Sequence, residues 1–314
     1  MPPMASYCPN AALTKYRVKK KEKKQMKKIA LISPASPTLT PFDKDAVRSF
    51  FKSVGYEPVY GKNAFKCDRF TAGSDIERAS DVMWAFSNPD IDAVMSIRGG
   101  YGTPRILDKI DYDVIQNNPK PFFGFSDVTA LQLAFLKKAG LVTFTGIQAG
   151  FVQNKIPNAL FETFSACLNR EPITFENLTP MTGKRATGIL VGGSLTMLTS
   201  LCGTIYMPNM AGAILVLEEV GEQPYRIDRM LEQLTLSGVL SNLKGVILGG
   251  FHNCVSKDKT DGTVDEVLNE RFGRLNIPVL KDFHYAHGGG EIVFPLGAKA
   301  VIDADNGVLE INEY

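Results

Sequence analysis

The stretch KPFFGFSDVTALQLAFLKKAG, residues 120–140, decides the fold class of this chain. Its first part is a short apolar run that predicts a buried strand, and this strand passes at Ser126 directly into a segment with the length and composition of a helix. The same alternation fills the residues before it. Predicted strands lie at 28–36, 56–61 and 91–100, and predicted helices at 43–55 and 73–89. Strands that alternate with helices form βαβ units, so a mostly parallel sheet with helices on both faces is predicted.

The second half of the chain is richer in strands. One strong helix, residues 225–238, ends at a glycine. Strands are predicted within 187–203, 212–221, 243–251 and 277–283, and a hairpin with an Asp-Asn-Gly turn within 296–312. The fold class is therefore α/β, with an N-terminal flavodoxin-like parallel-sheet domain followed by a smaller mixed α/β, strand-rich C-terminal domain. The predicted divisions are a basic leader (1–25), the N-terminal domain (26–155), a linker rich in prolines and polar turns (156–186) and the C-terminal domain (187–314).

Composition excludes several classes of protein. The 314 residues are 44% hydrophobic and 22% charged, as in ordinary soluble globular proteins. No apolar run approaches the ~18 residues that a transmembrane helix needs. The five cysteines are scattered without a CxxC pair, and there are only three histidines, which argues against a disulfide framework and against a zinc site. We expect neither a metal nor a cofactor.

The charge is concentrated at the start of the chain. Residues 1–25 hold seven basic residues and one acidic residue, so this segment contributes +6 to a net charge of +2 and leaves −4 to the remainder. No aromatic or amphipathic pattern accompanies the lysines, which favours a disordered tail, or a start at Met26, over a nucleic-acid or membrane-binding arm. The apolar run that follows is too short for a secretory signal. A cytoplasmic protein without nucleic-acid or membrane partners is predicted.

Ser126 is the first candidate for chemistry. A serine between a strand and a helix lies on a sharp turn, where the amides of the helix N-terminus can stabilise an oxyanion. The surrounding residues do not form G-x-S-x-G, so the nucleophile-elbow motif itself is not matched. The alternative is that Ser126 or Asp127 is only an N-cap.

Three other segments carry weaker signals. The glycines of GGYG (99–102) allow close approach of a ligand to the backbone, but they lack the order of a nucleotide-binding loop. Glu218 and Glu219 end an apolar strand, where one carboxylate can orient an imidazole and where solvated carboxylates are also common. Arg226 can bind a substrate carboxylate or form a surface ion pair with Glu222. His287 precedes three glycines, which suggests a tight approach of the backbone.

In order along the chain, these segments resemble the LD-carboxypeptidase family of serine peptidases, which also includes the microcin C immunity peptidases. The resemblance extends over nearly the whole chain from Lys28 onward. It is carried by ISPASP, IRGGYGTPRILDKIDYD, PFFGFSDVTALQLAF, GGSLTMLTSLCGT, LVLEEVGEQPYRIDRMLEQL, GVILGGF and HGGGEIVFPLG. Each block alone is weak, whereas the ordered set is specific.

The resemblance implies a function and a set of site residues. The family cuts an amide bond between an L-centre and a D-residue, typically releasing D-alanine from murein tetrapeptides during cytoplasmic recycling. By resemblance Ser126 is the nucleophile, His287 the general base and Glu218 its orienting partner, with Glu219 as the alternative carboxylate. The backbone amides of Gly100 and Asp127 would form the oxyanion hole. Tyr101 and Arg226 are candidate substrate contacts, and a homodimer is the implied assembly.

Two departures from the family pattern and two alternative functions accompany this prediction. Ala286 stands where the family usually has glycine before the histidine, and Ser194 where it commonly has asparagine. The first alternative is a microcin-immunity-type peptidase that hydrolyses aminoacyl-nucleotide amides. It is disfavoured because the single tryptophan, Trp84, is in the first half and so cannot provide a nucleobase stack in the second. The second alternative is a catalytically silent muropeptide-binding protein.

Overall fold

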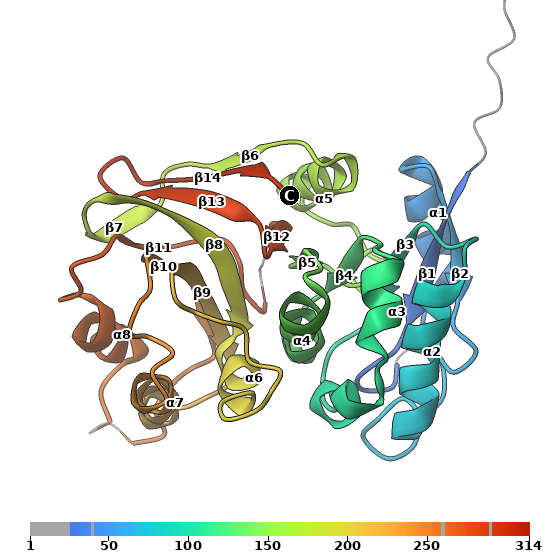
Figure 1. Ribbon diagram of the computed structural model, residues 1–314, viewed down its shortest axis with the longest axis horizontal. Helices are drawn as coiled ribbons and strands as arrows, with labels where there is room; N and C mark the ends of the chain where they lie inside the picture. The colour runs from blue at the N-terminus through green and yellow to red at the C-terminus, as the bar shows by residue number, and fades with distance from the viewer. Residues whose placement is uncertain (1–25, 39–40, 259–260, 289–290) are drawn as a thin grey trace, which may run out of the picture.

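The chain folds into two β-sheets that lie side by side with helices packed against them (Figure 1). The computed structural model describes residues 26–38, 41–258, 261–288 and 291–314. The predicted basic leader, residues 1–25, lies outside the described residues. Within the described ranges, no helix is both long enough and apolar enough to cross a membrane.

The first sheet has six strands in the order β12-β5-β4-β3-β1-β2. Strands β1 to β5 are mutually parallel, and β12 is antiparallel at the edge beside β5. The order β2-β1-β3-β4-β5 is that of flavodoxin-like sheets, so the predicted fold of this domain is confirmed. The strands are β1 (Lys27–Ile32), β2 (Tyr56–Tyr60), β3 (Ala93–Ser96), β4 (Phe122–Gly124), β5 (Thr143–Thr145) and β12 (Phe294–Leu296).

Both faces of this sheet are covered by helices. Successive residues of β1 point to opposite faces of the sheet. Ile29 and Leu31 pack in the core with α1 and α5, whereas Ala30 and Ile32 pack in the core with α2 and α4. Helix α2 begins after its N-cap, Ser74, in a capping box. The helices are α1 (Lys44–Ser53), α2 (Asp75–Ser87), α3 (Tyr112–Asn117), α4 (Thr129–Ala139) and α5 (Asn158–Asn169), with short 3-10 helices at Thr103–Lys109 and Ser126–Val128.

The second sheet has eight strands in the order β6-β14-β13-β8-β9-β10-β11-β7. Its centre, β8 to β11, is parallel, and the flanking strands are antiparallel. The predicted terminal hairpin is present as β13 and β14. The elements are β6 (Ile173–Phe175), β7 (Thr179–Thr182), β8 (Arg185–Ser194), α6 (Leu195–Ser200), β9 (Ala213–Val220), α7 (Pro224–Leu236), β10 (Gly245–His252), α8 (Val264–Phe272), β11 (Val279–Lys281), β13 (Lys299–Asp303) and β14 (Val308–Glu313).

Helix α4 joins the two halves. It lies near the middle of the molecule, against α6 and β8 of the second half (Figure 1). Residues 129–135 and Ala139 of this helix are buried, whereas Lys137 and Lys138 in its last turn are exposed. One continuous apolar core includes Ala30 of β1, Leu133 of α4 and Leu217 of β9. The serine that precedes α4 is therefore held at the junction of the two halves.

Two segments cross the divisions predicted from the sequence. Residues 156–186, predicted as a linker, contain α5 and also β6 and β7, the two edge strands of the second sheet. Strand β12, within 187–314, pairs with β5 of the first sheet. Edge strands are short, are partly exposed and tolerate proline. The prolines and polar residues of 156–186 are therefore compatible with the strands found there. The exact domain boundaries remain predictions.

Candidate active site

Ser126 lies on a sharp turn between β4 and α4. Its backbone has φ of +66°, which is uncommon for a residue with a side chain and marks the turn as strained. The adjacent loop approaches it closely, because a Cβ added at Gly99 would lie 2.8 Å from the Cβ of Ser126. The predicted strand-to-helix turn is thus present, and Ser126 is not an N-cap, since its side chain accepts no hydrogen bond from the helix.

His287 reaches this turn from the loop between β11 and β12. The loop rests on two glycines of β10, since a Cβ at Gly249 would lie 2.2 Å from the carbonyl oxygen of Tyr285 and one at Gly250 would lie 2.5 Å from the Cβ of Ala286. The methyl group of Ala286, the departure from the family pattern, therefore fits because residue 250 has no side chain. Gly288 has φ of +73° beside His252, as the tight approach predicted there requires, and residues 289–290 lie outside the described part of the chain.

A chain of hydrogen bonds connects the three predicted reacting groups. His287 Nε2 lies 2.8 Å from Ser126 Oγ, and His287 Nδ1 lies 2.7 Å from Glu218 Oε2. Glu218 is fully buried on β9, and its other oxygen, Oε1, has no hydrogen-bond partner among the described residues. A hydrogen bond is stronger in a buried environment than in water, so the bond from the buried Glu218 carboxylate fixes the orientation of the His287 imidazole. The serine belongs to one half of the molecule and the other two groups to the other half.

The neighbouring carboxylate, Glu219, points to the opposite side of β9, as successive residues in a strand do. It accepts hydrogen bonds from the amides of Thr196 (2.7 Å) and Val220 (2.9 Å). Burial raises the pKa of Glu219 above its usual value, against the lowering effect of these hydrogen bonds. Glu219 therefore holds the start of α6. Ser194, which stands where the family commonly has asparagine, is the N-cap of the same helix and accepts a hydrogen bond from the amide of Met197.

The side chain of Asp127 fixes the glycine-rich loop to the serine turn. Its carboxylate accepts hydrogen bonds from the amides of Gly102 (3.1 Å) and Thr103 (2.8 Å), and the hydroxyl of Thr103 donates to its carbonyl oxygen. Burial raises the pKa of Asp127, while these hydrogen bonds act in the opposite direction. From the sequence, Asp127 is predicted to contribute its backbone amide or to act as an N-cap. Its carboxylate instead binds the amides of Gly102 and Thr103, a contact between distant segments that no local motif indicates.

The amides predicted to form an oxyanion hole are available in the structure. Neither the Gly100 nor the Asp127 N–H donates a hydrogen bond to another described residue. Gly100 has φ of +111°, and a Cβ there would lie 2.4 Å from Ser36 Oγ, so this position needs glycine. Free amide N–H groups beside a serine hydroxyl can donate hydrogen bonds to a developing oxyanion.

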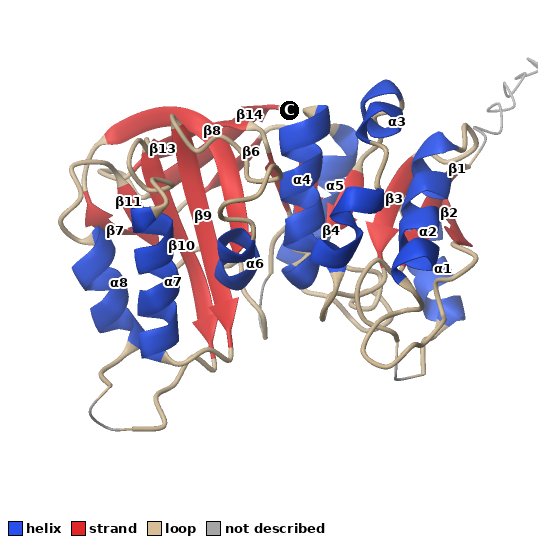
Figure 2. Ribbon diagram, turned by 60° about the horizontal axis from the view of Figure 1, so that its bottom comes forward, coloured by secondary structure: helices blue, strands red, loops and turns tan. Residues whose placement is uncertain are grey.

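A pocket of about 360 Å³ opens over this serine. It lies at the carboxyl ends of four parallel strands, where open α/β sheets bind ligands. In Figure 2 the arrowheads of β3 and of β9 and β10 point to the same side of the molecule, so both halves direct their loops there. The lining residues are Thr38, Phe42, Ile97, Arg98, Gly99, Gly100, Phe125, Ser126, Gln148, Gly150, Phe151, Gln153 and His287.

The two predicted substrate contacts lie outside this lining. Tyr101 is half exposed and packs edge-on against the ring of Phe70. Arg226 lies on α7, where it pairs with Glu222 at 3.4 Å and stacks on Tyr225. For Arg226 the ion pair with Glu222, which lies just before α7, is the alternative given by the sequence and is the arrangement found.

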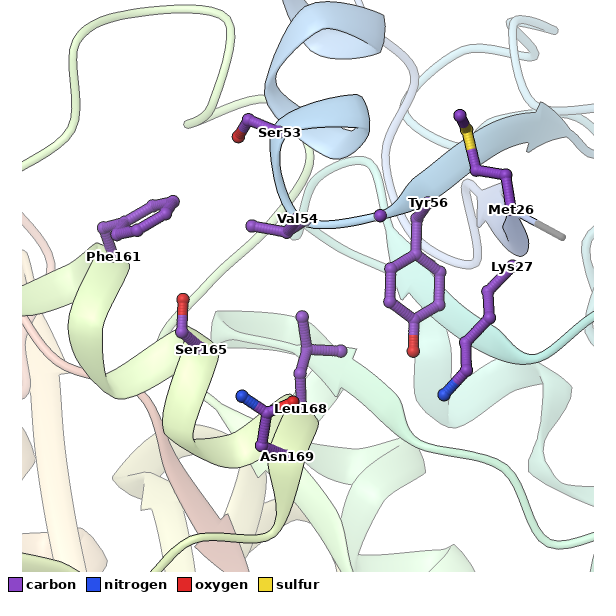
Figure 3. Close-up of a pocket in the computed structure, with 10 residues that line it drawn as sticks. Met26, Lys27, Ser53, Val54, Tyr56, Phe161, Ser165, Leu168 and Asn169 are labelled. Atoms are coloured by element: carbon purple, nitrogen blue, oxygen red, sulfur yellow. The ribbon is translucent and has the colours of Figure 1, made fainter. Parts of the chain in front are cut away.

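A larger cavity, of about 450 Å³, lies at the opposite end of the first sheet (Figure 3). It is formed at the amino ends of β1 and β2 and by α5, with Lys27, Tyr56 and Asn169 among its labelled side chains. Its serines, Ser53 and Ser165, have no histidine beside them in this lining. This cavity therefore lacks the pair of serine and histidine side chains that the smaller pocket contains. In the described part of the chain, no group of three or more His, Cys, Asp or Glu side chains is placed to hold a metal ion.

Two family models and several known proteins match this chain. Residues 29–146 match the N-terminal domain of LD-carboxypeptidases, and residues 187–302 match the C-terminal domain. The murein tetrapeptide carboxypeptidase of Pseudomonas aeruginosa is 31% identical over 88% of this chain and 94% of its own.

Solved structures are similar over the same length. The muramoyltetrapeptide carboxypeptidase of Oxalobacter formigenes superposes with a TM-score of 0.80 at 31% identity, covering 91% of this chain and 99% of its own. The microcin C7 self-immunity protein MccF of Escherichia coli, in its wild-type apo state, gives a TM-score of 0.83 at 28% identity, covering 92% of this chain and 97% of its own. The chain therefore belongs to the LD-carboxypeptidase family of serine-type peptidases.

Proposed function

We propose that this protein hydrolyses the L,D-amide bond of murein tetrapeptides and releases the terminal D-alanine. The observation that carries the proposal is the hydrogen-bonded chain from Ser126 through His287 to Glu218 at the floor of a pocket. In this proposal Ser126 is the nucleophile, His287 the general base and acid, and Glu218 the group that fixes the imidazole.

The reaction proceeds in two halves. Ser126 Oγ attacks the carbonyl carbon of the L-residue while His287 Nε2 takes the hydroxyl proton, and the carbonyl oxygen becomes an oxyanion held by the Gly100 and Asp127 amides. The carbon–nitrogen bond then breaks, and the D-alanine nitrogen receives the proton from His287. Water, deprotonated by the same imidazole, attacks the acyl-serine ester, and the shortened peptide leaves as a free acid while Ser126 regains its proton.

One observation in this chain favours a murein peptide over an aminoacyl-nucleotide amide. The relatives do not separate the two substrates, since those named for murein or muramoyl tetrapeptide cleavage and the MccF structures each match about nine-tenths of this chain. Solved structures of MccF include complexes with adenosine monophosphate and with aspartyl sulfamoyl adenosine. In this chain the single tryptophan, Trp84, packs on α2 against the apolar core, away from the pocket lining.

A cytoplasmic role in recycling of cell-wall peptides is part of the same proposal. The cysteines of the described residues, Cys67, Cys167, Cys202 and Cys254, are all unpaired thiols. Unpaired cysteines are typical of proteins kept in a reducing compartment.

The test is mass spectrometry of murein tri-, tetra- and pentapeptides incubated with the protein. We expect D-alanine and tripeptide from the tetrapeptide alone, and no product from a tetrapeptide that ends in L-alanine. Ser126→Ala is the matched control. Cleavage of an aminoacyl sulfamoyl adenosine in place of the tetrapeptide would support the alternative substrate, and binding without any turnover would support a silent muropeptide-binding protein.

Replacement of Asp127 by alanine is expected to lower kcat about 10²-fold. The change leaves the buried amides of Gly102 and Thr103 without their acceptor and frees the loop that carries the Gly100 amide. Steady-state release of D-alanine, together with thermal unfolding, measures it. Asp127→Asn, which keeps one acceptor oxygen, should fall between the alanine variant and the wild type. Wild-type kcat in Asp127→Ala would contradict the role of this clamp.

A further inference from the structure

The pocket over Ser126 contains one permanently charged side chain. Of its lining residues only Arg98 and His287 can carry a charge, and the imidazole is engaged with Ser126 and Glu218. The remainder of the lining is aromatic, aliphatic, amide, hydroxyl or glycine. Among the described residues, therefore, a charged group of a substrate that enters this pocket meets a single fixed cation, Arg98.

The guanidinium of Arg98 lies next to the proposed oxyanion hole. Its Nη2 is 3.5 Å from where a Cβ on Gly100 would be, and its Nη1 donates to the carbonyl oxygen of Pro37 at 3.0 Å. The residue is half-buried at the end of β3. Arg98 is thus held in place by the backbone of the first loop, with donors left over on a face that borders the pocket.

Arg98 also differs from the other arginines of its domain. Within the described part of residues 26–155, four of the five arginines have a carboxylate within 4.0 Å, whereas Arg98 has none. The four paired arginines are Arg48, Arg69, Arg78 and Arg105. A half-buried arginine without an acidic partner, inside a pocket, is suited to bind an anion supplied by a ligand.

We propose that Arg98 binds the C-terminal carboxylate of the residue that is released, and that this contact makes the enzyme act only at the free end of a peptide. The inference rests on the proposed function. In an L,D-carboxypeptidase substrate the free carboxylate is on the residue directly after the scissile carbonyl. A site that holds the carbonyl oxygen at Gly100 therefore places that carboxylate within reach of a guanidinium beside Gly100. The same contact excludes longer or amidated peptides, which would leave the half-buried cation unpaired.

The experiment compares two substrates with two enzymes. The substrates are the murein tetrapeptide as its free acid and the same peptide with a C-terminal carboxamide, and the enzymes are the wild type and Arg98→Gln. We expect the wild type to cleave the acid about 10²-fold more efficiently in kcat/KM than the amide, since bidentate charge-assisted hydrogen bonds have this order of effect. Arg98→Gln should lose about this factor on the acid and change little on the amide, so that the preference disappears.

Two further variants make the comparison specific. Arg48→Gln removes the same charge from α1, outside the pocket, and should retain the wild-type preference. Arg98→Lys keeps the charge without the planar pair of donors and should keep part of the preference. Arg98→Gln also loses the hydrogen bond to the Pro37 carbonyl oxygen, so its thermal unfolding is recorded as well. If this variant does not fold, the proposal is decided by the ratio of kcat/KM for the acid to kcat/KM for the amide in Arg98→Lys.

The outcomes separate this inference from the proposed function. Equal cleavage of acid and amide by the wild type, or an equal loss on both substrates in Arg98→Gln, overturns the carboxylate contact and leaves the carboxypeptidase proposal standing. No cleavage of either substrate by the wild type overturns the proposed function, and this inference with it.

Discussion

Ser126→Ala is expected to lower kcat for D-alanine release by about 10⁴-fold or more while leaving tetrapeptide binding intact. The variant removes the only atom that can form the acyl intermediate, and the oxyanion amides and His287 then act on water alone. The pocket lining is otherwise unchanged, so the dissociation constant should stay within a few-fold. Release of D-alanine measured by mass spectrometry, and binding measured by calorimetry with the tetrapeptide, test the two halves of this expectation.

A second substitution at the same position separates chemistry from backbone strain. Ser126→Gly also lacks the nucleophile and should be equally inactive. Because the residue has φ of +66°, glycine removes a steric penalty that alanine keeps, and the free energy of unfolding should rise by up to about 1 kcal/mol relative to Ser126→Ala. Retention of D-alanine release within ten-fold of the wild type in either variant would exclude Ser126 as the nucleophile.

Much of the first half of the fold could be predicted from local sequence. Alternating apolar runs and amphipathic segments indicate β1 to β4 and α1, α2 and α4. These elements are formed by contacts close in sequence, which periodicity and capping report directly. The parallel arrangement of the strands then follows from the rules for βαβ units.

What local sequence could not indicate is pairing between distant segments. Strand β12 joins β5 across about half the chain, and the edge strands β6 and β7 are three or four residues long with little apolar pattern. Their positions depend on the tertiary arrangement of both halves. No periodicity within 156–186 contains that information, which is why this segment was predicted as a linker.

The reacting groups show the same limit. Each of Ser126, Glu218 and His287 was ambiguous alone, and only the ordered set of motifs singled them out. The three side chains come together only because the chain packs closely around them. The glycines of β10 allow the His287 loop to lie against this strand, next to the strand that carries Glu218. The contact of Asp127 with the amides of Gly102 and Thr103 is likewise non-local, so the sequence indicates only a backbone or N-cap role for this residue.

Glu218→Gln is expected to lower kcat about 10⁴-fold, the second-largest effect of any single change. The buried carboxylate accepts from His287 Nδ1 and so leaves Nε2 free to take the proton of Ser126. A glutamine amide can instead donate to Nδ1, which stabilises the tautomer that carries its proton on Nε2 and cannot act as a base. It also removes the charge that stabilises the imidazolium formed during attack.

Glu219→Gln is the matched control, since it makes the same chemical change one residue along the same strand. Glu219 faces away from His287 and accepts from the amides of Thr196 and Val220, so its replacement should change kcat by less than ten-fold. It should reduce the free energy of unfolding by about 1 kcal/mol, because one charge-assisted hydrogen bond is weakened. Parallel measurement of kcat and thermal unfolding in both variants decides which carboxylate orients the imidazole. A large loss of kcat in Glu219→Gln with a small loss in Glu218→Gln would transfer that role to the neighbouring residue and require a different arrangement of the His287 loop during turnover.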